Sequence, residues 1–164
     1  MIYKVLNGIK IVNKAQGYIG GGLVMATALV MLYDVVMRYI AGSPSIRAPF
    51  LASFLMLSAI FVGTAYALQH GGHVHLSILL DKLKPLPVKI CLTVGYCFAG
   101  IFVYFLARES FNHAVTAARM NRVAVGHLPV PLSILYGIMV FGLAMLLISL
   151  AGKLVEVWLN KEDN

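Results

Sequence analysis

The segment GYIGGGLVMATALVMLYDVVMRYI, residues 17–40, decides the fold class of this chain. Its charged side chains are one acid and one base, Asp34 and Arg38, and both stand in its last third. About 20 apolar residues in a helix that rises about 1.5 Å per residue span the roughly 30 Å hydrocarbon core of a bilayer. The segment is therefore predicted to be a transmembrane helix.

Three further apolar runs have the same character, at about residues 48–68, 86–107 and 129–150. Of the 164 residues, 60% are hydrophobic, whereas soluble domains contain about 45–50% apolar residues. In lipid a helix satisfies its own backbone hydrogen bonds, so each run is expected to be helical. The third helix is expected to project beyond the membrane or bend onto its surface after residue 107, and the fourth to continue through Trp158. The prediction is an all-α integral membrane protein, a single membrane domain over residues 1–164 with four transmembrane helices plus amphipathic interfacial helices.

An interfacial helix is predicted before the first span, over about residues 1–14. Apolar residues recur there at helical spacing, and lysines lie on the opposite face. Such a helix lies in the plane of the membrane surface with its lysines among the phosphates. The tryptophan near the chain's end also suits that interface. The residues expected to contact phospholipid are Lys4, Lys10, Lys14 and Trp158.

The charges indicate orientation. The net charge is +7, but only 12% of the residues are charged. The sequence contains no cluster of basic residues interleaved with aromatic residues, so we do not expect nucleic-acid binding. All lysines fall in the N-terminal segment, the second loop and the C-terminal segment, and all arginines at the first and third loops. The eight lysines on one side outnumber the five arginines on the other, and cytoplasmic loops carry an excess of positive residues. Both termini are therefore predicted to be cytoplasmic.

Three histidines, His70, His73 and His75, stand close together after the second span. A haem bundle needs axial histidines inside facing helices, and a membrane diiron enzyme needs several histidine boxes on one face. Gly71 and Gly72 instead indicate the end of a helix. We therefore expect no metal, no cofactor and no catalytic residue.

Asp34 and Arg38 are four residues apart and share one helix face. A charge within a membrane helix suggests function. A coupled ion site would need more carboxylates at mid-membrane, however, and the spans offer none. A structural charge pair near the outer end of the first span is the favoured interpretation, with a transport site as the alternative.

Small residues recur at four-residue spacing inside the spans, which permits helices to approach closely. The packing could be within this chain or against a membrane partner. The predicted helix-packing positions are Gly17, Gly21, Gly22, Ala26, Gly63, Ala67, Gly95 and Ala99.

Three segments together resemble a known family. They are DVVMRYIAG (34–42), FVGTAYALQHGGHVHLSILLDKLKPLP (61–87) and LPVPLSILYGIMVFG (128–142). Their order and spacing are similar to the small membrane subunit, or Q subunit, of tripartite ATP-independent periplasmic (TRAP) transporters. Two positions depart from the family pattern: the second span starts Arg47-Ala48-Pro49-Phe50 without the usual tryptophan and glutamate, and Ser77 replaces an acidic residue.

The resemblance implies a non-enzymatic subunit of a sodium-coupled secondary transporter in a bacterial inner membrane. In such a system a large elevator-type subunit and a periplasmic binding protein import an organic acid, such as sialic acid or a C4-dicarboxylate. The small subunit would scaffold the large one. Three residues at the outer loops, here called the outer arginines, could dock the binding protein or contact lipid headgroups: Arg47, Arg119 and Arg122. The alternative function is a membrane anchor or cytochrome-like subunit of a redox enzyme.

Overall fold

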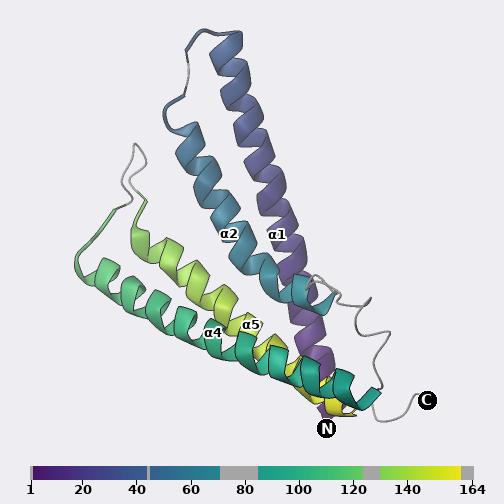
Figure 1. Cartoon of the computed structure of the whole chain (residues 1–164). Helices are drawn as coiled ribbons and strands as arrows, with labels where there is room; N and C mark the ends of the chain where they lie inside the picture. Colours follow the sequence, from purple (N-terminus) through teal and green to yellow (C-terminus); the bar gives the residue numbers. More distant parts are fainter. Residues whose placement is uncertain (1, 44, 71–84, 124–129, 160–164) are drawn as a thin grey trace.

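In the computed structural model, the described residues form an all-α bundle of four long helices (Figure 1). The helices are α1 (Ile2–Tyr39), α2 (Ala48–Gln69), α4 (Pro85–Arg119) and α5 (Leu132–Leu159). The structure describes residues 2–43, 45–70, 85–123 and 130–159, and the side chains of 8–43, 45–70, 90–123 and 130–158. Each helix is long and apolar enough to cross a bilayer. The predicted all-α membrane fold is confirmed.

The helices are arranged as two hairpins. α1 packs along α2, α4 packs along α5, and contacts between α2 and α5 join the two pairs. Figure 1 shows the hairpins diverging from the end of the molecule at which α1 begins and α5 ends. With four helices running alternately up and down, α1 starts and α5 ends on the same side of a membrane.

The apolar core lies where the hairpins meet. It consists of Leu68 from α2, Val103 from α4 and three leucines of α5, Leu143, Leu146 and Leu150. Many other apolar side chains of the helices are exposed. Lipid tails are as apolar as leucine, so outward-facing apolar residues are expected of a helix bundle in a bilayer.

The N-terminal segment differs from the prediction in its connection to the first span. The predicted interfacial helix (1–14) and span (17–40) form the continuous helix α1. The connecting sequence, residues 13–16, contains no proline or glycine that would end a helix. At about 1.5 Å per residue α1 is roughly 57 Å long, so part of it extends beyond a hydrocarbon core of roughly 30 Å.

The last two helices extend past the apolar runs 86–107 and 129–150, as the sequence leads us to expect. α4 continues to Arg119 and α5 continues to Leu159. α4 ends because Asn121 adopts a left-handed conformation, with φ 46°. The N–H of Arg122 then donates to the carbonyl of Ala117 at 3.0 Å, and that of Asn121 to the carbonyl of Ala118 at 3.4 Å. This pattern is the Schellman motif that closes many helix ends.

Candidate functional site

A buried polar contact connects the two hairpins at the end of the bundle where α1 begins and α5 ends. Asn13 of α1 is 1% exposed and Ser149 of α5 is 2% exposed. The Asn13 amide donates to Ser149 Oγ at 2.7 Å, and the serine hydroxyl donates to the Met145 carbonyl at 2.9 Å. In a buried position such a pair is costly to break, because each group would be left without a partner. The contact therefore fixes α1 relative to α5.

A charged cluster lies close to this contact. The carboxylate of Glu156 on α5 accepts from Lys153 of the same helix at 3.1 Å. It also pairs with Lys10 of α1 at 3.4 Å. These side chains are partly exposed, so each pair contributes little alone. Together they form a second connection between α1 and α5.

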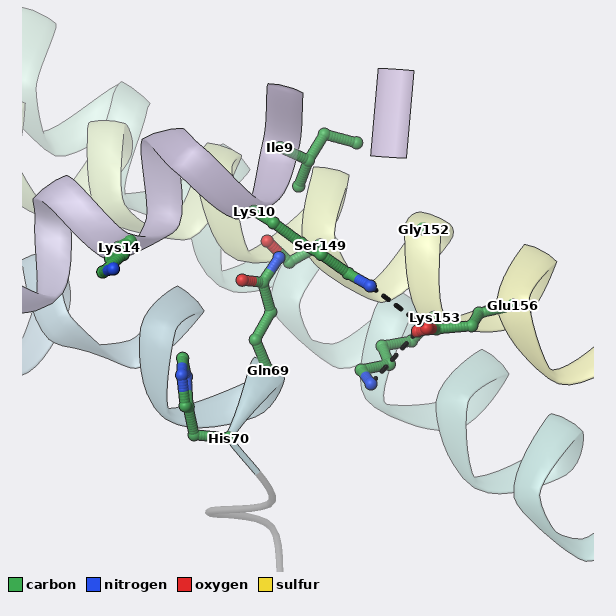
Figure 2. A pocket seen from close by; sticks show the side chains of 9 residues that line it. All are labelled: Ile9, Lys10, Lys14, Gln69, His70, Ser149, Gly152, Lys153 and Glu156. Atoms are coloured by element: carbon green, nitrogen blue, oxygen red, sulfur yellow. Dashed lines mark hydrogen bonds and ion pairs between the residues drawn. The ribbon is translucent and has the colours of Figure 1, made fainter. Parts of the chain in front are cut away.

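A cavity of about 240 Å³ opens beside the cluster. Figure 2 shows Lys10, Lys153 and Glu156 on one side of it and the end of α2, with Gln69 and His70, on another. Ile9, Lys14, Ser149 and Gly152 complete the lining. Three lysines against one glutamate give this cavity a positive character. We call it the basic pocket.

Gln16, one turn after Asn13, is a buried polar residue with a different environment. It is 3% exposed, and neither its amide nitrogen nor its amide oxygen has a hydrogen-bond partner among the described residues. A buried amide without partners is costly. An ordered water or a group from another molecule at this position would relieve that cost.

Asp34 and Arg38 are in contact within α1. Arg38 Nη2 donates to Asp34 Oδ2 at 2.8 Å. Asp34 is 6% exposed, and its Oδ1 has no partner among the described residues, whereas half of the Arg38 side chain is exposed. The arrangement suits a charge pair whose arginine reaches toward the membrane surface.

Of the three clustered histidines, the described residues include only His70. It follows the last residue of α2, its Nδ1 lies 3.2 Å from the Tyr66 carbonyl, and its ring lies against the Tyr66 ring at 4.1 Å. It therefore contacts the helix end, as a residue at a helix boundary does. His73 and His75 lie outside the described residues.

The outer arginines are at the end of the bundle opposite the start of α1 and the end of α5, but not in one group. Arg47 immediately precedes α2, while Arg119 ends α4 and Arg122 follows it. Figure 1 shows these two helix ends at the separate tips of the diverging hairpins. All three are exposed. Any one partner that contacts all of them must reach both tips.

Among the predicted lipid contacts, Lys10, Lys14 and Trp158 are exposed. The side chain of Lys4 lies outside the described residues. Lys10 and Lys14 are also the α1 lysines of the basic pocket.

The small residues have two kinds of surroundings. A methyl group on Gly17 would meet the Tyr66 ring at 2.5 Å, so α1 and α2 approach closely there. A methyl group on Gly21, Gly22 or Gly95 would meet nothing within 4 Å, and Ala67 is exposed. Ala26 is half-buried, and Ala99 packs against the apolar core. The open positions remain available to lipid or to another membrane protein.

Other close-packing glycines were not predicted. Gly20 approaches Gly63 of α2, where an added methyl would lie 3.3 Å from the Gly63 Cα. Gly142 of α5 lies directly against the backbone of Phe61 on α2, and an added methyl would overlap it. The polar residues Asn13, Gln16 and Ser149 were also missed, although polar residues in a membrane helix are themselves a signal of internal contact.

A comparison with protein families gives a match over residues 27–160. The matched family is described as tripartite ATP-independent periplasmic transporters, DctQ component. The match begins inside α1 and covers the other three helices. A search among curated proteins finds no match to the chain.

Proposed function

The chain belongs to the DctQ component family of tripartite ATP-independent periplasmic transporters, and we propose that it is the fixed membrane scaffold for the large transporter subunit. It is a transporter component, not an enzyme. The family implies a large membrane subunit and a periplasmic binding protein as partners. This membership selects the transporter hypothesis over a redox-enzyme anchor.

The connection between the hairpins is the observation that carries the scaffold role. Asn13 and Ser149 bond in a buried site, and Gly142 brings α5 against the backbone of α2. Close packing and satisfied buried hydrogen bonds favour one fixed arrangement over several. A large subunit that changes its position during transport needs a stationary partner, and a rigid pair of hairpins can supply it.

The distribution of carboxylates supports placing the coupling ion outside this chain. The described residues include three carboxylates, Asp34, Glu109 and Glu156. Each contacts a neighbouring side chain: Arg38 for Asp34, Asn112 for Glu109, and Lys10 and Lys153 for Glu156. We therefore propose that the large subunit binds sodium and the organic acid, such as a sialic acid or a C4-dicarboxylate.

The outer surface and the orientation complete the proposal. The lysine and arginine distribution supports cytoplasmic termini in a multi-pass inner-membrane protein. The outer arginines would then face the periplasm, where they attract an acidic surface of the binding protein. Charges at the rim of an interface mainly accelerate encounter. Asp34 and Arg38 stabilise the outer end of α1.

The proposal is tested by purification and uptake together. An affinity-tagged version of this chain, extracted in mild detergent, should retain the large subunit at a one-to-one ratio. Proteoliposomes with both membrane subunits, the binding protein and a sodium gradient should take up an organic acid, and those without this chain should not. Full uptake by the large subunit alone would refute the scaffold role.

A further inference from the structure

We propose that the basic pocket binds the phosphate of an anionic phospholipid. This assignment goes beyond general contacts between lysines and the membrane surface, because it names one cavity between three helices. α1 contributes Lys10 and Lys14, α5 contributes Lys153 and Glu156, and the end of α2 contributes Gln69 and His70. It does not depend on the proposed scaffold role.

The position of the pocket relative to the membrane follows from the length of α2. This helix has 22 residues, or about 33 Å, close to the roughly 30 Å of a hydrocarbon core. Its last residue, Gln69, and the following His70 therefore mark one boundary of that core, and both line the pocket. The cavity is therefore expected at the boundary between the hydrocarbon core and the headgroup region that holds the phospholipid phosphates.

The charges of the pocket favour an anion. Its three lysines and one glutamate leave a net charge of +2 with His70 neutral. Lys10 and Lys153 share the carboxylate of Glu156, and each ammonium has three donors, so both keep hydrogens for another acceptor. Lys14 forms no ion pair with any described residue. Basic pockets between transmembrane helices are known sites for anionic headgroups.

The size of the pocket suits a headgroup fragment. Its volume of about 240 Å³ is below the roughly 300–1,000 Å³ of pockets that hold drug-sized ligands. The Gln69 amide adds a neutral polar group to its wall, and Ile9 adds an apolar side chain. A phosphate with part of its glycerol fits these groups, while the acyl chains remain in the membrane.

Native mass spectrometry of the full-length protein in detergent tests the proposal. The probes are phosphatidylglycerol and phosphatidylcholine with identical acyl chains, and inorganic phosphate as a competitor. The wild type should bind one phosphatidylglycerol at least tenfold more tightly than phosphatidylcholine. Equal affinity for the two lipids would overturn the proposal. Displacement of bound lipid by millimolar phosphate would assign the pocket to a free anion and overturn the lipid assignment.

Three variants test the residues. Lys14→Gln should weaken phosphatidylglycerol binding about fivefold, which corresponds to about 1 kcal/mol per lysine near an anionic surface. Arg108→Gln removes a positive charge from an exposed position of α4 that does not line the pocket, and it should leave the affinity unchanged. Glu156→Gln raises the pocket's charge and should tighten binding. Equal effects of Lys14→Gln and Arg108→Gln, or weaker binding by Glu156→Gln, would contradict the assignment.

Discussion

Replacing Gly142 with alanine should weaken the junction between the two hairpins. Gly142 lies on α5 where this helix meets α2, and a methyl group there would overlap the Phe61 carbonyl, 2.6 Å from its carbon. Ordinary contacts of this kind are 3.4–4 Å. The atom in the way is backbone, which a change of side-chain rotamer cannot move. The helices must therefore separate by about 1 Å.

The size of the effect follows from this separation. A gap of about 0.5–1 Å removes roughly a quarter to a half of the dispersion energy of each contact across it. Inserting an extra carbon into a packed interior typically costs about 1–3 kcal/mol. Alanine also gains about 0.5–1 kcal/mol over glycine within a helix. The packing cost and the helix preference of alanine oppose each other. The variant is therefore compared with a control in which only the helix preference changes.

Gly137→Ala supplies that control. Gly137 is on the same helix and is exposed, and an added methyl would meet nothing within 4 Å. Unfolding by increasing mole fractions of sodium dodecyl sulfate in mixed micelles, followed by circular dichroism, gives the free energy of unfolding of each variant. Gly142→Ala should be about 1–3 kcal/mol less stable than Gly137→Ala. Equal stability of the two variants would refute the close packing of α5 on α2.

Three other predictions concern charge. The first concerns orientation and uses single cysteines in a chain with Cys91 and Cys97 replaced by serine. An impermeant thiol reagent on intact cells should label cysteines placed at Ser45 and Asn121, on the outer side, but not at Lys84 and Lys161, on the inner side. The reverse pattern would exclude cytoplasmic termini. The second concerns the charge pair in α1. Asp34→Asn or Arg38→Gln alone should lower the free energy of unfolding by about 1–3 kcal/mol, and the double variant should recover part of that loss. Additive losses would argue against a direct interaction. The third concerns docking. Charge reversal of the outer arginines should raise the binding-protein concentration that gives half-maximal uptake into proteoliposomes, most strongly at low salt. An unchanged concentration would assign these arginines to lipid contacts.

The membrane fold could be predicted from the sequence because apolar length alone determines it. The second span, predicted over 48–68, differs from α2 (Ala48–Gln69) by one residue. The start of the first span was harder to place. Lys10 and Lys14 suggested a separate surface helix, but charged residues do not end a helix, and α1 continues through them. Local hydropathy shows where a chain can enter lipid, whereas helix ends depend on backbone conformation, as at Asn121.

The candidate site was less predictable because it is built from residues far apart in the sequence. Asp34 and Arg38 are predictable neighbours, because residues four apart in a helix always share a face. No such rule relates Asn13 to Ser149 or Lys10 to Glu156, which meet only because α5 returns to the start of α1. Glycine spacing has the same limit. Gly21 and Gly142 look alike in sequence, but only Gly142 faces another helix.

The central claim, that this chain is a fixed scaffold, is tested most directly by locking α1 to α5. Asn13→Cys and Ser149→Cys, in a chain without Cys91 and Cys97, place two thiols where the buried hydrogen bond joins the helices. A short bifunctional thiol reagent would cross-link them, and a reduced, uncross-linked sample controls for loss of the hydrogen bond. Sodium-driven uptake of the organic acid is then measured in proteoliposomes with the large subunit and the binding protein. A fixed scaffold predicts the same uptake rate with and without the cross-link, and loss of uptake only in the cross-linked sample would contradict it.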